Sequence, residues 1–475
     1  MMLETILWVL CPFIAGFVIM LLPRLDRLLA VVAVLVSAGF GAQALRMRSP
    51  LIVQLLDSAG VTLQIDTLGG YFILTNAVVT LAVLFYCWQS DRTSFFYAQL
   101  LMLHGSLNAA FICADFMSLY VALEVTGIAA FLLIAYPRSD RTLWVGLRYL
   151  FISNVAMLFY LVGAVLVYQT HQSFQFAGLV DSPPEALALI FLGLLAKGGI
   201  FVSGLWLPLT HSESDTPVSA MLSGVVVKAS LLPLLRCSLI QDEIGAIVAT
   251  LGIGTALLGV GFAMFERDAK RMLALSTLSQ VGFILVAPEM GGFYALSHGV
   301  AKSSLFLSSG SLPSRDFKVL QQTPLTLSLW LPLAIAGLSI SGFPGLIGFG
   351  AKVWTTKQLL PWQGLLMTIA ATGTAVVFAK FLFLPRGPWQ PPKPNYLAAQ
   401  LLLLGGLVAG NGFYLKAYTL ANLGKALITI AIGWLLYFTI AQRLTFKLPN
   451  VAEQFEHLIG VMSLMLVLLF WMALA

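Results

Sequence analysis

Residues 187–207 read LALIFLGLLAKGGIFVSGLWL, and this run decides the class of fold. A membrane-spanning helix needs roughly 20 apolar residues, and the one charged residue of this run, Lys197, lies near its midpoint. Similar runs recur along the chain of 475 residues, of which 59% are hydrophobic and 10% charged. A soluble domain carries about 25% charged residues, and a disordered chain has low hydrophobicity. The sequence therefore predicts an all-α polytopic membrane protein.

A hydropathy window of about 19 residues predicts about 14–16 transmembrane helices. The polar segment 47–68 is expected to form a hairpin or a surface loop outside the membrane. The candidate spans are 4–22, 28–46, 69–88, 95–113, 115–136, 147–169, 187–207, 217–238, 244–264, 272–288, 291–311, 326–357, 363–384, 395–418, 422–441 and 458–475.

Basic residues are unevenly distributed between the loops that join these spans. Most of them lie in odd-numbered loops, as Arg138, Arg267 and Arg386 do, whereas few, such as Arg46 and Lys416, lie at even-numbered loops. Cytoplasmic loops of membrane proteins carry an excess of Lys and Arg. We therefore expect the N-terminus on the outer side. The membrane is expected to be a bacterial plasma membrane or an internal energy-transducing membrane.

Two apolar segments contain residues that interrupt helices. Residues 326–357 are too long for one straight span of about 20 residues, and Ser341-Gly-Phe-Pro-Gly345 lies in the middle. The segment after Lys197 contains Ser203-Gly-Leu-Trp-Leu-Pro208. Pro removes a backbone hydrogen bond, and a pair of interrupted helices indicates a transport path. We predict broken helices, with the breaks at Pro208, Gly342, Pro344 and Gly345.

Charged residues inside the spans are the main candidates for function. Lys197, Lys228 and Lys302 lie close to the midpoints of their spans, Lys352 follows the second break, and Glu124 is an acid at mid-span. A central Lys costs about 2.5–3.5 kcal/mol on insertion scales, so these side chains should face protein, water or one another. Because burial disfavours the charged form, such a Lys can exchange a proton near neutral pH.

These charges allow two interpretations. They could form a proton relay, in which Glu124 pairs with Lys197 and separation of the pair releases a proton, or they could form static ion pairs between helices. One Glu cannot neutralise all the lysines, which favours the relay. His298 shares a helical face with Lys302, and it is either a relay member or a packing residue. Arg236 and Lys380 lie near span ends, where their side chains can snorkel to the interface.

The remaining polar residues exclude several classes of protein. His211, Glu213 and Asp215 are either an ion entry or part of a solvated loop. The four cysteines are far apart and contain no C-x-x-C, so we predict neither a disulfide framework nor a metal or iron–sulfur site. The sequence has no P-loop, and its basic residues form no patch, so ATP and nucleic acid are not expected as partners.

Several ordered motifs carry a resemblance to a known family. In the first half they are Leu119-Tyr-Val-Ala-Leu-Glu124, Leu194-Leu-Ala-Lys197 and Thr216-Pro-Val-Ser-Ala220. In the second half they are ERDAKRMLALSTLSQVG at 266–282, HGVAKSSLF at 298–306 and GFPGLIGF at 342–349. From roughly 95 to 385, the chain resembles the antiporter-like membrane subunits shared by respiratory complex I and Mrp-type cation/proton antiporters. Within that family it most resembles the Mrp D-type subunit.

The resemblance implies two inverted five-helix repeats, with helices seven and twelve broken. It divides the chain into N-terminal helices (1–94), a first antiporter-like repeat (95–238), a second repeat (244–385) and C-terminal helices (395–475). It also implies a polar axis along the membrane midplane, made of Glu124 on helix five, Lys197 on seven, Lys228 on eight, His298 and Lys302 on eleven and Lys352 on twelve.

Three functional hypotheses follow. The first is a proton-translocating subunit of a multisubunit Mrp-type complex, which exchanges protons for Na⁺ or another cation and binds no cofactor of its own. The second is a proton-pumping subunit of a complex I-like quinone oxidoreductase, or of a related hydrogenase or carbon-uptake complex, without a redox site of its own. The third is a non-conducting scaffold. All three expect a lipid bilayer and other membrane subunits as partners, and none assigns a catalytic or metal-ligating residue.

Overall fold

The computed structural model describes residues 2–55, 60–442 and 454–474, and most of these residues are helical. Within these ranges, 13 helices or groups of joined helices are long and apolar enough to cross a membrane. Further expected spans correspond to α12 (Ala269–Leu285), α13 (Pro288–Ser309) and the pair α15 (Leu327–Ser341) and α16 (Ile347–Lys357). The chain is therefore an all-α polytopic membrane protein, as the sequence predicted.

The N-terminal part consists of two helices, a β-hairpin and a third helix. The hairpin forms in the polar segment 47–68, where Leu51 of one strand pairs with Ile65 of the other in antiparallel register. Asp66 then accepts a hydrogen bond from the backbone N–H of Gly69 and so begins the third helix. The elements are α1 (Met2–Leu21), α2 (Asp26–Ala44), β1 (Leu51–Gln54), β2 (Thr62–Ile65) and α3 (Thr67–Cys87).

The central region is described below as a first segment, 94–238, and a second segment, 242–382. The first segment contains α4 (Ser94–Ile112), α5 (Phe116–Ile134), α6 (Asp140–His171), η2 (Phe176–Leu179), α7 (Pro184–Gly198), η3 (Phe201–Trp206), α8 (Leu207–Glu213), α9 (Thr216–Gly224), η4 (Val226–Ala229) and α10 (Leu231–Ser238). The second segment contains α11 (Asp242–Phe265), α12, α13, α14 (Phe317–Leu320), α15, α16 and α17 (Pro361–Leu382).

The same local connection occurs once in each segment. An aspartate caps a helix, Asp115 at the start of α5 and Asp268 at the start of α12, by accepting backbone N–H bonds. Next to each cap, two backbone hydrogen bonds join the start of the capped helix to the residues that follow the next helix along the chain. That next helix is α6 in the first segment and α13 in the second. These bonds run from Phe116 N to Phe174 O, from Phe176 N to Ala114 O, from Ala269 N to Arg315 O and from Phe317 N to Arg267 O.

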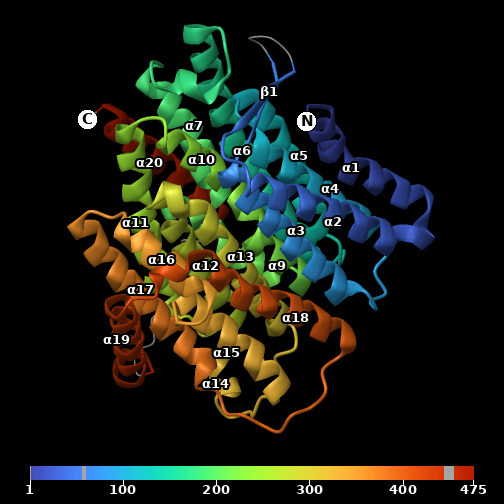
Figure 1. The fold of residues 1–475 in the computed structure, drawn as a ribbon, viewed down its shortest axis with the longest axis vertical. Helices are drawn as coiled ribbons and strands as arrows, with labels where there is room; N and C mark the ends of the chain where they lie inside the picture. The colour runs from blue at the N-terminus through green and yellow to red at the C-terminus, as the bar shows by residue number, and fades with distance from the viewer. Residues whose placement is uncertain (1, 56–59, 443–453, 475) are drawn as a thin grey trace.

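The chain ends in α18 (Pro394–Ala409), η5 (Gly410–Ala417), α19 (Leu420–Leu436), η6 (Tyr437–Ala441) and α20 (Phe455–Leu474). Helix α19 packs against α17 of the second segment, whereas α20 packs against α6 and α7 of the first (Figure 1).

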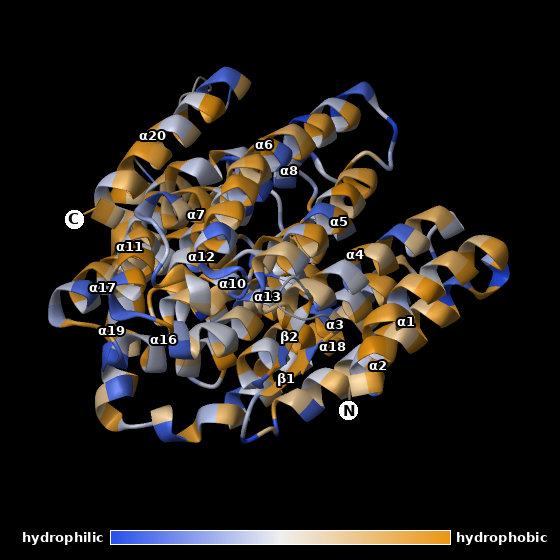
Figure 2. Ribbon diagram, turned by 90° about the horizontal axis from the view of Figure 1, so that it is seen from above, coloured by the Kyte–Doolittle hydropathy of each residue, from blue (hydrophilic) through white to orange (hydrophobic). Residues whose placement is uncertain are grey.

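Burial divides the helices into an outer and an inner set. Only 28% of the most apolar window of α1 is buried, against 100% of the window in 216–238. Figure 2 shows the outer helices, such as α1, as largely hydrophobic ribbon. In α13, every residue from Met290 to Ser309 is buried. A helix that is apolar on its exposed side belongs in lipid, so the polar residues of interest lie in the inner set.

Candidate functional site

The first helix break lies between α7 and α8. Helix α7 ends at Gly198, and Gly199 follows in the left-handed region with φ +66°. The chain then passes through η3 and resumes as an α-helix at Leu207. Pro208 lies in the first turn of α8, where its missing N–H is not needed. The interruption therefore begins several residues before Pro208, and Lys197 lies in the last turn before it.

The second break lies between α15 and α16. Gly342 and Gly345 adopt φ +88° and +94°, values that only glycine reaches without strain. Pro344 lies between them, and the N–H of Gly345 donates to the Tyr418 hydroxyl at 2.7 Å. Lys352 lies in α16, and its Nζ donates to the carbonyl oxygen of Ser341 at 3.4 Å. The break thus exposes a backbone carbonyl that holds the lysine.

Lys197 contacts two different side chains. Its Nζ donates to the Ser153 hydroxyl of α6 at 2.9 Å, and it lies 3.8 Å from Glu124 Oε1 of α5. The Lys197 side chain is 4% exposed and that of Glu124 23%. The structure therefore brings the expected pair together, and it adds a serine that the sequence reasoning missed.

Lys228 and Lys302 are both fully buried. Lys228 Nζ donates to the carbonyl oxygen of Ser223 at 3.0 Å. Lys302 Nζ donates to the carbonyl oxygen of Leu273 at 2.8 Å and to the Ser276 hydroxyl. Within the described ranges, Lys197 is the one member of the lysine row (Lys197, Lys228, Lys302 and Lys352) that has an ion pair with a carboxylate. Neutral oxygens hold the other members.

A polar chain extends beyond Lys302 between α12 and α13. The Tyr294 hydroxyl donates to Gln280 Oε1 at 2.7 Å, and Gln280 Nε2 donates to the Thr374 hydroxyl at 3.3 Å. Gln280 lies one turn after Ser276 on α12. Lys352 Nζ lies 5.1 Å from the ring of Phe283, which also belongs to α12 and stacks on Tyr294.

This polar chain was not predicted from the sequence. The available signal was helical spacing, because Tyr294, His298 and Lys302 recur every four residues and so share one face of α13. His298 is 2% exposed. Neither of its ring nitrogens has a hydrogen-bond partner among the described residues.

The three residues considered as an ion entry do not form one cluster. His211 is fully buried in α8, with its ring centroid 6.3 Å from that of Trp206 and 6.0 Å from that of Phe306. Glu213 pairs with Arg141 at 3.3 Å, and Asp215 pairs with Arg92. Across the described part of the chain, no group of three His, Cys, Asp or Glu residues could hold a metal ion.

Arg236 and Lys380 lie in the last turns of α10 and α17 and contact the ends of neighbouring helices. Arg236 is 6% exposed and pairs with Asp66, and it also donates to the carbonyl oxygens of Cys113 and Phe111 at the end of α4. Lys380 is 8% exposed and donates to the carbonyl oxygens of Ala263 and Glu266 at the end of α11. Helix ends carry unpaired carbonyls, and these cations cap the ends of α4 and α11.

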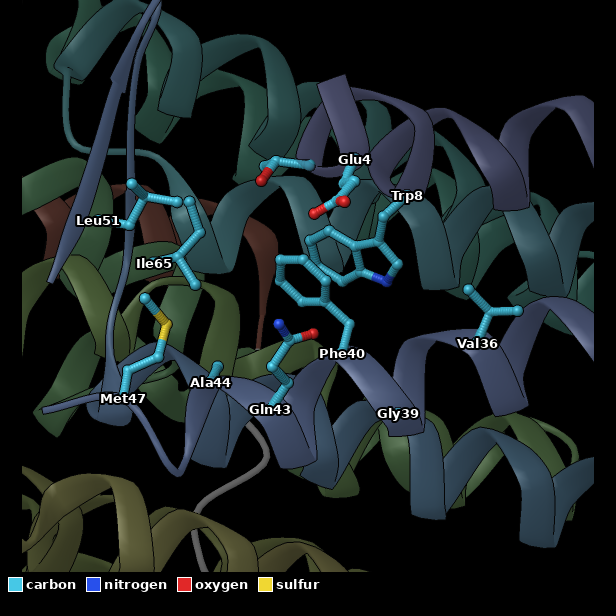
Figure 3. Close-up of a pocket in the computed structure, with 11 residues that line it drawn as sticks. Glu4, Trp8, Val36, Gly39, Phe40, Gln43, Ala44, Met47, Leu51 and Ile65 are labelled. Carbon is cyan, nitrogen blue, oxygen red and sulfur yellow. The ribbon is translucent and has the colours of Figure 1, made fainter. Parts of the chain in front are cut away.

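A separate cavity of about 410 Å³ lies between α1, α2 and the hairpin. Figure 3 shows the rings of Trp8 and Phe40 lying parallel there, with centroids 3.8 Å apart. Glu4 and Gln43 also line it. None of the lysine row contributes to this cavity, so it is not part of the candidate site.

The chain is similar to two groups of curated proteins. It is 32% identical over 331 residues to NADH-quinone oxidoreductase subunit N of Desulforudis audaxviator (strain MP104C), covering 62% of the chain and 65% of that protein. It is 27% identical, in an alignment of 470 residues, to a probable K(+)/H(+) antiporter protein of Rhizobium meliloti (strain 1021), covering 85% of the chain and 46% of that protein. The chain therefore spans about two thirds of the first relative and about half of the second.

The fold is also that of a solved membrane complex. A chain of the Mrp complex from Dietzia sp. DQ12-45-1b superposes with a TM-score of 0.80 at 23% identity, covering 98% of this chain and 59% of that one. A family model described as "NADH:quinone oxidoreductase/Mrp antiporter, TM" matches residues 113–378, which include every residue of the lysine row and Glu124. The chain belongs to this NADH:quinone oxidoreductase/Mrp antiporter family of membrane proteins.

Proposed function

We propose that the chain is a proton-translocating subunit of a multisubunit, Mrp-type membrane complex that exchanges protons for Na⁺ or another cation. The observation that carries this proposal is the lysine row: Lys197, Lys228 and Lys302 are buried and Lys352 is partly buried, while only Lys197 has an ion pair with a carboxylate among the residues described. The proposed relay runs through Glu124, Lys197, Lys228, His298, Lys302 and Lys352.

The chemistry of the row favours proton exchange over static pairing. A buried lysine that pairs with a carboxylate is fixed in its charged form, whereas one that donates to neutral oxygens can become neutral without leaving an unpaired carboxylate. Lys228, Lys302 and Lys352 all donate to backbone carbonyls. The proton of each can therefore leave at a small electrostatic penalty, which suits a relay.

The polar side chains between the lysines support passage along the row. Ser276 contacts Lys302, Gln280 follows one turn later on α12, and Tyr294 donates to Gln280. These polar side chains follow α12 from Lys302 towards Phe283, whose ring lies 5.1 Å from Lys352 Nζ. We infer that protons pass between the two segments along these side chains, aided by water at His298.

The test is transport by the intact complex in everted membrane vesicles. Lys197→Ala and Glu124→Gln should each abolish cation-dependent proton movement, measured with a pH-sensitive dye. Lys357→Ala is the matched control, because Lys357 lies at the exposed end of α16 over the ring of Trp354. Normal transport by an assembled Lys197→Ala complex would refute the relay and leave the scaffold as the role of this chain.

A redox-driven proton pump is the second candidate function. It is favoured by the relative at 32% identity, which is a subunit of an NADH-quinone oxidoreductase. The relay would be the same, but the energy would come from electron transfer in other subunits. Mass spectrometry of the complex captured through this chain separates the two. Small membrane partners alone favour the antiporter, and flavin or iron–sulfur subunits favour the pump.

A further inference from the structure

The ammonium group of Lys197 lies near two possible partners, Ser153 and Glu124. In the structure Nζ is hydrogen-bonded to Ser153 Oγ at 2.9 Å, while Glu124 Oε1 lies at 3.8 Å, beyond hydrogen-bond distance. Glu124 Oε1 is buried and accepts no hydrogen bond from any described residue. A buried carboxylate oxygen normally has a donor. The carboxylate thus has an open acceptor position beside the lysine, and the lysine is bound elsewhere.

Gly127 provides the room between these partners. It lies three residues after Glu124 on α5, so both face the same way. A Cβ atom at Gly127 would lie 3.3 Å from Lys197 Nζ and 3.7 Å from Ser153 Oγ. The missing side chain therefore leaves a path over α5 along which the ammonium group can move from Ser153 to Glu124.

We propose that Ser153 is a second position for the Lys197 amino group, and that Lys197 alternates between Glu124 and Ser153 during transport. Ser153 is a positioning residue in this cycle. The inference rests on the proposed function, since it assigns a role within the Glu124–Lys197 step of the relay.

The chemistry of a hydroxyl suits this role better than that of a carboxylate. A serine hydroxyl accepts a hydrogen bond from an ammonium group and can donate one to a neutral amine, whereas an ionised carboxylate only accepts. Ser153 can therefore hold Lys197 in both protonation states, and Glu124 holds it only when charged. At Ser153, Lys197 would pass its proton to Lys228, the next member of the proposed relay, and it would take up a proton from Glu124 as it returns to that carboxyl group.

Several other titratable groups lie around this position, among them the buried Arg148 of α6. Tyr120 of α5 and Tyr149 of α6 lie close enough to interact with Glu124. Lys228, in η4, donates to Ser223, and Arg236, in α10, pairs with Asp66. Helix α20, which packs on α7, has its titratable residues, Glu456 and His457, in its first turn.

The experiment compares three substitutions at Ser153 in the assembled complex. Ser153→Ala leaves Lys197 on Glu124, so it should lower the maximal transport rate about tenfold and move the pH optimum to the alkaline side by on the order of one unit, because pairing favours the charged lysine. Ser153→Thr keeps the hydroxyl and should restore the profile. Ser153→Asp supplies a second carboxylate and should abolish transport.

Ser309→Ala is the matched control, because Ser309 is a buried serine whose hydroxyl bonds only a backbone carbonyl in α13. Its pH profile should stay unchanged. Electron cryomicroscopy of the Ser153→Ala complex should show Nζ within hydrogen-bond distance of Glu124. An unchanged pH profile in Ser153→Ala, with Lys197→Ala inactive, would overturn the role of Ser153 and keep the relay. Activity in Lys197→Ala would instead overturn the proposed function itself.

Discussion

The first and second segments each hold a lysine beside a helix break, but in different ways. In the first, Lys197 precedes the break and lies between Ser153 and Glu124. In the second, Lys352 follows the break and is held by the carbonyl oxygen of Ser341, with the ring of Phe283 nearby. Both breaks begin at a glycine with positive φ. In both segments a glycine with positive φ interrupts the helix beside the lysine. The segments differ in that the Glu124 carboxylate lies near the lysine in the first.

This difference shows that burying a lysine does not require an acid. A backbone carbonyl released by a broken helix can hold an amino group, because its hydrogen bond has no competing intrahelical donor. In the relay proposed above, the task of the Glu124 carboxylate is to control proton release from Lys197. Among the described residues no carboxylate pairs with Lys352, so the proposal gives the second segment no such control.

The largest loss of transport is expected when residue 352 keeps its positive charge but can no longer release a proton. Lys352→Arg places a guanidinium, which stays protonated in proteins, beside the Ser341 carbonyl. Transport should fall by about 10²-fold or more, as for loss of a group that transfers protons. Dye-monitored transport in vesicles measures this, with Lys357→Arg as the control. Retained transport would mean that Lys352 only holds α16 in place.

An intermediate loss of function or stability is expected when alanine replaces the glycine that begins either break. Gly342→Ala and Gly199→Ala each force a Cβ into the left-handed region at about 1–2 kcal/mol, so both should lower the melting temperature of the purified complex. The new Cβ would lie 3.0 Å from Lys352 Cδ in the first case and 3.0 Å from Leu207 Cδ1 in the second.

Only Gly342→Ala therefore disturbs a relay lysine directly and should also slow transport. Gly364→Ala is the control, since a Cβ there meets no other atom within 4 Å and the site is helical. Equal transport loss at Gly199 and Gly342 would contradict this distinction between the segments.

The smallest effect on transport is expected from the cations that cap α4 and α11, whose loss should act on stability instead. Arg236→Met removes an ion pair with Asp66 together with donors to several carbonyls, and should cost roughly 2–4 kcal/mol. Lys380→Met removes donors to two carbonyls and should cost about 1–2 kcal/mol. Unfolding of the complex, followed by intrinsic fluorescence, compares the two. If Lys380→Met lost more stability than Arg236→Met, the packing around these side chains would contribute more to the free energy of unfolding than their hydrogen bonds to the helix-end carbonyls.

The sequence predicted features that depend on local composition. Spans follow from hydropathy, and the depth of Lys197 or Lys302 follows from its place within a span. The first break was placed near Pro208, although α7 already ends at Gly198, because a glycine that packs and one that reverses φ look alike in sequence.

Partners across helices were harder to predict. Arg236 and Lys380 were expected near span ends, but the carbonyls that they bind could not be named, because position along a span gives depth and not neighbours. Ser153 could not be found for the same reason, since it lies 44 residues from Lys197 in the chain. Sequence reasoning therefore named the charged groups of the site but missed the neutral groups that hold them.

The burial of α13 from Met290 to Ser309 has a consequence for membrane insertion of the chain. Although α13 has 22 residues, it is not among the helices that are long and apolar enough to cross a membrane, within the ranges that the structure describes. Its surroundings are α3, α9, α12, α15, α16 and α18, which shield His298 and Lys302 from lipid. During biosynthesis α13 emerges before α15 and α18 exist. It must therefore be retained at the insertion machinery, or beside earlier helices, until these later helices are made.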